Sequence, residues 1–272
     1  MRDKDLPFKI IMSDMDGTLL PPDKIITPKS LEMIERLQAA DIKLCLASAR
    51  PPKGMMRYIK QLDLNNICAG FNGSVIFGPH GHLYRDITLP LPLVQELISA
   101  LLPHPIEIWL QDYETWLVED ASTELVIYEQ GVTDVAPREV DNLLEHAMPV
   151  SRIVATGPDI NLIASLEHSF NNSYKDQAAI TRSSPYMLDI TAPVATKGAA
   201  LRAIAELYKI QPQQIIAIGD AENDISLLEE SGLGIAMGHA PQALKNVASF
   251  VTDDNENEGW ANAVEKIILP RL

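Results

Sequence analysis

Short apolar runs alternate with amphipathic stretches at both ends of this chain, and the residues between them follow a different pattern. Residues 8–12 and 42–47 are apolar, and residues 28–40 and 53–62 have the spacing of helices. Near-continuous apolar strands separated by helices indicate a parallel sheet that is covered on both faces. The same alternation returns at residue 197. The sequence therefore predicts one doubly wound, Rossmann-like α/β core built from both ends of the chain.

Further elements of this core are a short strand at 67–70 and, after residue 197, helices and strands at 197–207, 215–218, 224–231, 234–237 and 241–248.

The middle of the chain is predicted to form an inserted α+β unit. Its expected elements are helices at 93–102 and 159–170, an antiparallel pair at 106–111 and 115–119, a strand at 152–155, and a hairpin of 178–183 with 186–190. We expect residues 1–85 and 191–272 to form the core and residues 86–190 to form the inserted cap. Such an insertion is placed to cover a site on the core and close over it.

Composition narrows the class of partner. The 272 residues are 46% hydrophobic and 22% charged, with a formal net charge of −15. That charge argues against a nucleic acid or an anionic membrane surface as the partner. An anionic substrate would need a local positive group. Cys45 and Cys68 are expected to be buried free thiols, and the absence of a signal sequence or membrane span predicts a cytoplasmic protein.

Two aspartates stand where the first apolar strand gives way to a loop. Asp14 and Asp16 are one residue apart, so alternation along a strand places them on a common face, and Gly17 lets the chain turn after them. Like charges this close resist joint ionisation unless a cation neutralises them or one of them keeps its proton. The pair is therefore a candidate for chemistry rather than for stability.

Other polar residues follow the remaining strands of the predicted sheet. Ser48 follows the second strand, Asp220 and Asp224 follow the strand at 215–218, and Lys197 begins a helix. In an open α/β sheet, ligands gather at the carboxyl ends of the strands. Carboxylate oxygens without Cys or His suit Mg²⁺ better than a structural zinc. A hydroxyl, a lysine and loop amides around such a metal would hold a phosphate.

These residues resemble the four motifs of the haloacid dehalogenase-like phosphatases, in order and in context. The motifs in this chain are Asp14-x-Asp16-Gly17-Thr18, Ser48, Lys197-Gly198 and Gly219-Asp220-x-x-Asn223-Asp224. Asn72-Gly73, Gly234-Ile235-Ala236-Met237-Gly238, Thr252-Asp253 and Glu258-Gly259 are further matches to the Cof-type subfamily. Members of that subfamily carry a C2-type α/β cap between the second and third motifs, and the likeness spans essentially the whole chain.

The resemblance implies a role for each matching residue. Asp14 corresponds to the nucleophile that forms an aspartyl-phosphate, and Asp16 to the general acid and base. Asp14, Asp220, Asp224 and the backbone carbonyl of Asp16 correspond to the Mg²⁺ site. The implied phosphate contacts are Ser48, Lys197, the amides of Met15 and Ala49, and the side chain of Asn223.

The chain departs from the subfamily at a few positions. Ser48-Ala49-Arg50 stands where Thr-Gly-Arg is common, which keeps the hydroxyl but gives up the conformational freedom of glycine. His239 stands where Asn is common and is expected to make a local hydrogen bond. Nothing in the sequence explains Trp260.

Several assignments stay open at this point. Arg50 could pair with a carboxylate or contact substrate, and Asn72 could contact substrate or only stabilise a turn. Arg182, Ser184 and Tyr186 are candidate substrate contacts in the cap. Trp109 and Trp116 are expected to pack in the inserted unit rather than stack on bases.

By analogy with the family, we expect a Mg²⁺-dependent phosphatase of small phosphorylated metabolites. Sugar phosphates come first as substrates, ahead of cofactor phosphates such as pyridoxal phosphate or flavin mononucleotide. The alternatives are a phosphomutase on the same core and a phosphate-binding sensor without catalysis. The oligomeric state is left open by the sequence.

Overall fold

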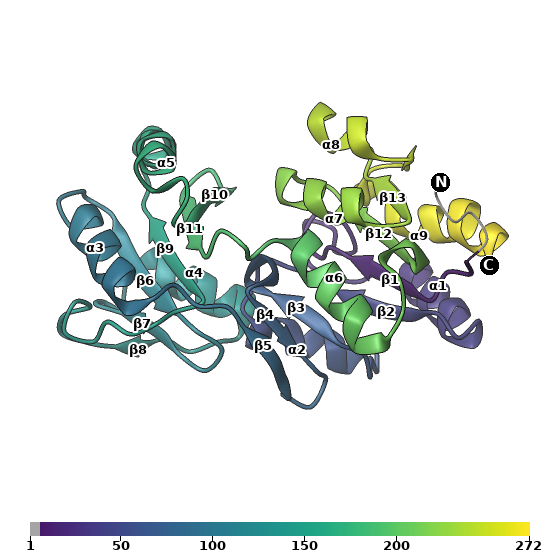
Figure 1. Ribbon diagram of the computed structural model, residues 1–272, viewed down its shortest axis with the longest axis horizontal. Coiled ribbons are helices and arrows are strands. Elements are labelled where there is room, and N and C mark those ends of the chain that lie inside the picture. Colours follow the sequence, from purple (N-terminus) through teal and green to yellow (C-terminus); the bar gives the residue numbers. More distant parts are fainter. Residues whose placement is uncertain (1–5) are drawn as a thin grey trace.

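The apolar runs from the two ends of the chain come together in one parallel sheet, as predicted. The computed structural model describes residues 6–272, and this sheet occupies the right-hand half of Figure 1. Its strands, in spatial order, are β14 (Phe250–Val251), β13 (Leu233–Ala236), β12 (Ile215–Gly219), β1 (Ile10–Ser13) and β2 (Lys43–Leu46). β3 (Cys68–Gly70) continues the sheet beyond β2 through a parallel bridge between Ala47 and Ala69.

Alternate side chains of these strands enter two different helical layers. Ile11 packs into a core cluster with residues of α1 (Pro28–Ala39), α2 (Pro52–Gln61) and α9 (Gly259–Ala263). Ile10 packs on the opposite face. The helices of that second layer are α6 (Lys197–Tyr208), α7 (Ile225–Glu230) and α8 (Gln242–Val247). Each fully buried Ile or Leu of these layers contributes about 1.5–3 kcal/mol before the entropy of ordering is subtracted.

β1 lies in the interior of the sheet and is the strand from which the winding reverses. Ser13, its last residue, is in register with Leu46 of β2 on one side and Ile218 of β12 on the other. The chain builds outward from β1 to β2 and β3 first, and later from β12 to β13 and β14. Ligands of doubly wound sheets bind at this reversal, at the carboxyl ends of the strands. The residues after β1, β2 and β12 are therefore the ones this topology brings together.

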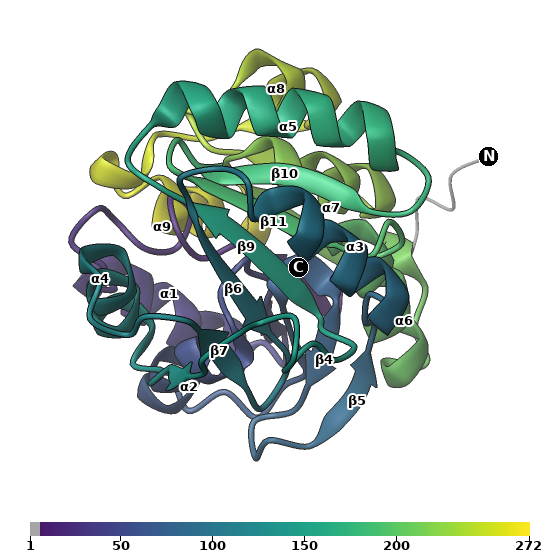
Figure 2. The same ribbon diagram turned by 90° about the vertical axis from the view of Figure 1, so that its left-hand side faces the viewer.

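The middle of the chain forms a second sheet with its own core. Its strands, in spatial order, are β10 (Ala179–Ser184), β11 (Met187–Thr191), β9 (Arg152–Thr156), β6 (Glu107–Gln111), β7 (Trp116–Val118) and β8 (Arg138–Glu139). In Figure 2, α3 (Leu91–Leu101) and α5 (Ile160–Tyr174) lie on the side of this sheet that faces the viewer, away from the parallel sheet. α4 (Glu124–Thr133) packs against α2 of the core. The predicted pairings β6–β7 and β10–β11 are both confirmed as antiparallel.

Two smaller predictions, one on the tryptophans and one on the cysteines, were also confirmed. Trp109 and Trp116 are buried and pack edge to face, with ring centroids 5.3 Å apart. Cys45 and Cys68 are buried free thiols, and burial raises the pKa of Cys68 to about 12. Among residues 6–272, no helix is both long and apolar enough to cross a membrane.

Several elements of the fold were not predicted. β4 (Val75–Phe77) and β5 (Leu83–Asp86) form an antiparallel extension of β3, and α4 is a full helix. β4 is wholly buried and β5 wholly exposed, so neither strand shows the alternation that marks a half-buried strand. α4 exposes both Ile127 and Tyr128, so its apolar residues do not form a single stripe.

We propose residues 86–190 as the bounds of the inserted unit. β5 ends at Asp86 and β11 ends at Thr191, so each bound falls within one residue of a strand end. The hydroxyl of Ser151 donates to Asp86 at 2.7 Å, and the hydroxyl of Ser74 donates to the Ser151 carbonyl at 3.2 Å. These bonds tie the start of β9 to the place where the chain first passes between the two sheets.

Gly73 is the position where this junction tolerates least change. Its φ is +99°, and a methyl group added to it would lie 2.4 Å from the carbonyl oxygen of Thr196, just before α6. We expect Gly73→Ala to lower the free energy of unfolding by about 1–3 kcal/mol, because both the backbone and the contact are strained.

The matched control is Gly131→Ala in α4, where nothing lies within 4 Å of the added methyl group. There the change is expected to stabilise the helix by about 0.5–1 kcal/mol. Denaturant unfolding of both variants checks the pair, and equal effects at the two glycines would contradict this account.

Candidate active site

The polar residues that follow the parallel strands line one cleft between the two sheets. Asp14 and Asp16 follow β1, Ser48 follows β2, and Asp220 follows β12. The cleft has a volume of about 670 Å³, and its far side is formed by residues of β10 in the inserted unit, among them Arg182. The topology thus brings together the residues that the sequence singled out along some two hundred positions of chain.

Lys197 is the buried centre of this site. It begins α6, where the hydroxyl of Thr196 caps the helix by accepting from the amide of Ala199. Its ammonium lies 2.5 Å from Asp14 Oδ1 and 2.6 Å from Asp224 Oδ1, and it is only 1% exposed. Burial alone would lower the pKa of Lys197, but the two carboxylates raise it above its ordinary value. The ammonium is therefore a fixed positive charge.

Three carboxylates lie close together beside this lysine. Ligand oxygens of Asp14, Asp220 and Asp224 all lie within 4.8 Å of one another. Burial raises the pKa of Asp14 well above its usual range; Lys197 opposes this shift, and the neighbouring Asp224 and Asp220 add to it. Burial and then the charge of Asp224 raise the pKa of Asp220, which the hydroxyl of Thr18 partly offsets by donating to it at 2.7 Å.

The cluster fits a divalent cation. All three groups offer hard oxygen ligands, which is what Mg²⁺ requires, and Lys197 is the one cation bonded to the cluster among the described residues. The backbone makes room for the cluster at Gly17, where a methyl group would lie 2.3 Å from Asp220 Oδ2. Asp224 holds the loop in place by accepting from the amides of Asp220 at 3.0 Å and Ala221 at 3.1 Å.

Asp16 lies beside Asp14 but in a different electrostatic environment. Arg50 binds it through both Nε at 2.6 Å and Nη2 at 2.8 Å, and Lys24 lies 2.8 Å from the same carboxylate. Although burial would raise the pKa of Asp16, these two cations lower it to about 2. Of the two interpretations of Arg50 that the sequence left open, the structure shows the pairing with a carboxylate. Arg50 also donates to the Val132 carbonyl of α4 at 3.1 Å, so it joins Asp16 to the inserted unit.

The remaining residues of the predicted phosphate site lie around Asp14 and Asp16. Ser48, Ala49 and Asn223 line the cleft, and Asn72 does so in a left-handed conformation with its Oδ1 accepting from Asn223 at 2.8 Å. The side chain of Met15 is buried in the hydrophobic core, so only its backbone is available to a ligand.

Of the three candidate substrate contacts in the cap, one lines the cleft and two do not. Arg182 lines the cleft, where its side chain is held by Glu167 at 2.6 Å, but Ser184 and Tyr186 lie outside the set of residues that line it. β10 is the edge strand of its sheet. Three consecutive residues, Thr181 to Ser183, therefore reach the cleft.

The structure gives Trp260 and His239 definite partners. The indole of Trp260 donates to the hydroxyl of Ser13 at 3.0 Å, and that hydroxyl donates to the Asp14 carbonyl at 2.7 Å. His239 Nε2 lies 3.4 Å from Asp220 Oδ2. Sequence reasoning passed over Thr18 and Lys24. Thr18 belongs to the first motif and could have been found there, but the sequence carries no signal for Lys24.

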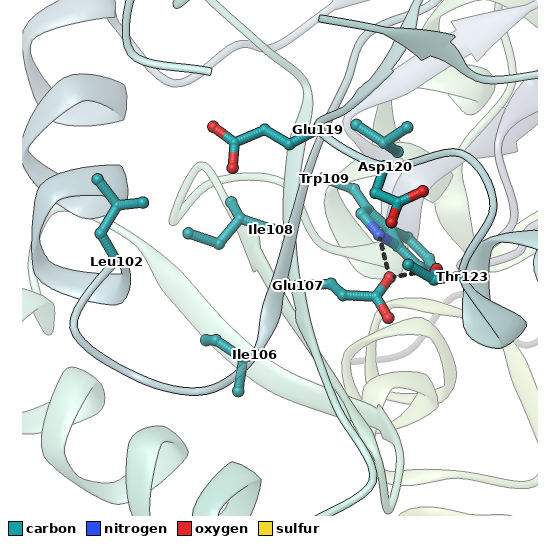
Figure 3. Close-up of a pocket in the computed structure, with 9 residues that line it drawn as sticks. Leu102, Ile106, Glu107, Ile108, Trp109, Glu119, Asp120 and Thr123 are labelled. Carbon is teal, nitrogen blue, oxygen red and sulfur yellow. Dashed lines mark hydrogen bonds between the residues drawn. The ribbon is translucent and has the colours of Figure 1, made fainter. Parts of the chain in front are cut away.

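A second pocket, on the inserted unit, is separate from this site. Figure 3 shows it lined by Glu107, Glu119 and Asp120, with Trp109 and Thr123 both donating to Glu107. Glu119 accepts from the amide of Leu143 at 2.9 Å. Glu107 and Glu119 therefore serve as hydrogen-bond acceptors within the inserted unit.

We expect Asp220→Asn to stabilise the metal-free protein. A raised carboxyl pKa in the folded state contributes stability below the unfolded pKa, near 3.9, and that stability is lost as the pH rises through the folded value. Above the folded pKa of Asp220 its burial and the nearby charge of Asp224 count against the folded state, and the variant removes that carboxylate. Thermal unfolding in EDTA should show a higher midpoint than wild type, and added Mg²⁺ should no longer raise it.

The matched control is Asp176→Asn at an exposed position of the inserted unit, which should behave as wild type in both conditions. A lower midpoint for Asp220→Asn in EDTA, or a retained response to Mg²⁺, would show that the cluster is not a cation site.

Comparison with known proteins places this geometry in a family. The model of the haloacid dehalogenase-like hydrolases matches residues 11–264. A provisionally named phosphatase of Haemophilus influenzae is 30% identical over 95% of this chain and 98% of its own, and a pyridoxal phosphate phosphatase of Escherichia coli is 27% identical over 94% and 97%. A haloacid dehalogenase-like hydrolase of Bacteroides thetaiotaomicron superposes with a TM-score of 0.86 at 28% identity, covering 96% of this chain and 99% of that one. The chain belongs to the haloacid dehalogenase-like hydrolases, and it is a Cof-type enzyme of that family with an inserted α/β cap.

Proposed function

We propose that this enzyme is a Mg²⁺-dependent phosphatase that hydrolyses small phosphorylated metabolites through an aspartyl-phosphate on Asp14. The observation that carries the proposal is the pair Asp14 and Asp16 at the head of one cleft, with Lys197 bonded to the first and Ser48 beside it. A nucleophile, an acid or base, and fixed phosphate-binding groups are what phosphoryl transfer requires.

In the first half of the reaction, a carboxylate oxygen of Asp14 attacks phosphorus. Lys197 holds Asp14 Oδ1, which leaves Oδ2 to form the new P–O bond. The hydroxyl of Ser48, the amides of Met15 and Ala49, and the side chain of Asn223 hold the other phosphoryl oxygens. The bond to the leaving oxygen breaks as Asp16 gives that oxygen a proton.

In the second half, water replaces the leaving group. Asp16, now ionised, takes a proton from the water as its oxygen attacks phosphorus. The P–O bond to Asp14 breaks, so inorganic phosphate leaves and the Asp14 carboxylate is restored. Mg²⁺ held by Asp14, Asp220, Asp224 and the Asp16 carbonyl would neutralise the charge of the phosphoryl group.

Asp16 must be released before it can act as an acid. With both carboxylate oxygens bound by Arg50 and Lys24, its pKa lies near 2 and it carries no proton to donate at neutral pH. In the conformation described here, Asp16 is therefore ionised and cannot act as a general acid. Release from the two cations raises the pKa of Asp16 and prepares it for the leaving group.

The cleft favours a polyhydroxylated leaving group. Among the described residues that line it, none is aromatic, while Asn72, Thr181, Ser183 and Glu222 offer hydrogen bonds. Hydroxyl groups are recognised through such bonds, whereas flat rings are recognised by stacking. Sugar phosphates are accordingly the first substrate class we propose. Pyridoxal phosphate comes second, because the E. coli relative is named for that substrate.

Two other functions are less well supported. A phosphomutase would need to return the phosphoryl group to a bound sugar, and a sensor would need no nucleophile beside an acid. Asp14 and Asp16 stand together in this chain, which favours hydrolysis over mere binding.

The test of the proposed function is phosphate release from p-nitrophenyl phosphate and a panel of sugar phosphates, pyridoxal phosphate and flavin mononucleotide. Wild type should release phosphate with Mg²⁺ and not with EDTA, and sugar phosphates should have the highest kcat/KM. Asp14→Asn should release none, because the amide is not a nucleophile. A folded wild type that binds Mg²⁺ and phosphate but turns over no compound would instead indicate a sensor or a mutase.

Removing one of the two cations that bind Asp16 should change how kcat/KM depends on the leaving group of the substrate. Lys24→Met removes one of its two cations, so the pKa of Asp16 rises and more of it can donate a proton. We expect kcat/KM for sugar phosphates to rise relative to that for p-nitrophenyl phosphate, whose leaving group needs little protonation.

Lys29→Met is the control, since Lys29 pairs with Glu265 rather than with the site. An unchanged ratio of the two kcat/KM values in Lys24→Met would show that Lys24 does not control proton donation by Asp16.

A further inference from the structure

The loop that follows β2 is held by both units of the protein. The carbonyl of Ser48 accepts from the amide of Asn72 at 2.9 Å, and the carbonyl of Arg50 accepts from the amide of Phe71 at 3.0 Å. The carbonyl between them, that of Ala49, accepts from Nη1 of Arg152 at 3.1 Å. The core backbone thus fixes the two ends of the loop, and a side chain of the inserted unit fixes its middle.

The peptide that Arg152 binds also reaches the hydroxyl of Ser48. The carbonyl of Ala49 and the N–H of Arg50 belong to the same peptide group, and that N–H donates to Ser48 Oγ at 3.1 Å. A peptide whose carbonyl is bound by a cation becomes a stronger donor through its N–H. Because Ser48 Oγ accepts this bond, its own proton is directed elsewhere, and the cleft is the side on which Ser48 is open.

Arg152 is itself held more rigidly than a residue that only fills space. It is 2% exposed, and Gln111 Oε1 accepts from both its Nε at 2.8 Å and its Nη2 at 2.5 Å. Asp189 lies 3.2 Å from Nη1, and the guanidinium stacks 5.0 Å from the centre of the Phe71 ring. A planar fork bound on several sides can aim one N–H at one carbonyl, which a flexible lysine cannot do as well.

The position of Arg152 in the fold suits such a link. It begins β9 directly after Ser151, whose bonds to Asp86 and Ser74 tie that strand to the junction of the two units. Arg152 thus reaches the loop after β2 from a strand whose start is fixed at that junction.

We propose that Arg152 is a positioning residue, which orients the Ser48 hydroxyl toward a phosphoryl oxygen by holding the peptide between Ala49 and Arg50. The inference rests on the proposed role of Ser48 in binding phosphate. The proposal adds that the inserted unit helps to form the phosphate-binding site as well as to cover it.

The experiment compares Arg152→Met/Asp189→Asn with Asp189→Asn alone. The double variant removes the guanidinium without leaving Asp189 as an unpaired buried charge, and the single variant keeps Arg152 on the Ala49 carbonyl. Binding of inorganic phosphate in the presence of Mg²⁺ is measured by calorimetry, and hydrogen exchange of the Arg50 amide is measured in the same proteins.

The double variant should bind phosphate about tenfold more weakly than wild type, as expected for the loss of one oriented hydrogen bond. Its Arg50 amide should also exchange faster. Asp189→Asn should bind phosphate within about twofold of wild type, because the asparagine oxygen still accepts from Nη1 and Arg152 stays on the Ala49 carbonyl. A purely structural role for Arg152 would lower the unfolding midpoint while leaving the phosphate affinity of the folded protein unchanged, and that result would overturn the proposal.

Two further provisions keep the outcome clear. If the double variant does not fold, Arg152→Lys keeps the charge next to Asp189 while losing the fork, and unchanged phosphate affinity in that variant would equally overturn the proposal. Turnover is measured separately. A wild type that binds phosphate but hydrolyses nothing would defeat the phosphatase, while the calorimetric comparison would still decide the role of Arg152.

Discussion

The structure of the site depends on the buried contact of one ammonium with two carboxylates. Lys197 joins Asp14, at the end of the first strand, to Asp224, in the loop that follows β12. Taking such charges out of water costs several kcal/mol per ion, and removing one partner of a buried pair costs about 3–5 kcal/mol. The contact is held in place by the amides of Asp220 and Ala221, which donate to the other oxygen of Asp224. It therefore sets both the spacing of the carboxylates and the demand of the cluster for a further cation.

The two aspartates of the first motif illustrate how one fold gives similar groups opposite properties. Asp14 is buried beside two other carboxylates, so its pKa is raised despite its bond to Lys197. Asp16 lies against Arg50 and Lys24, so its pKa is lowered. Divergent pKa values in adjacent groups are characteristic of acid–base sites. Arg50 also donates to the carbonyl of Val132, which links the Asp16 carboxylate to the inserted unit.

Much of the architecture could be predicted because its causes are local. Apolar runs and helical spacing gave the parallel sheet, the inserted unit and the hairpin of β10 and β11. Other features depend on register between distant segments. The partner of Trp260 is Ser13, and the peptide aimed by Arg152 lies about a hundred residues away, so no local pattern could indicate either. Which cap residues border the cleft depends likewise on how β10, an edge strand, lies against the core, and the sequence of the cap does not encode that contact locally.

The order in which the chain is made has a consequence for how the site forms. β1 is synthesised early, yet it pairs with β12, its aspartate binds Lys197, and Ser13 bonds with Trp260, all near the far end of the chain. Contacts between such distant segments form late in folding because closing the long loop between them costs entropy. The inserted unit has its own apolar core, and its last strand precedes β12 and Trp260 in the chain. We therefore expect the cap to fold while the core still lacks its last strands, so that the site between them is completed late.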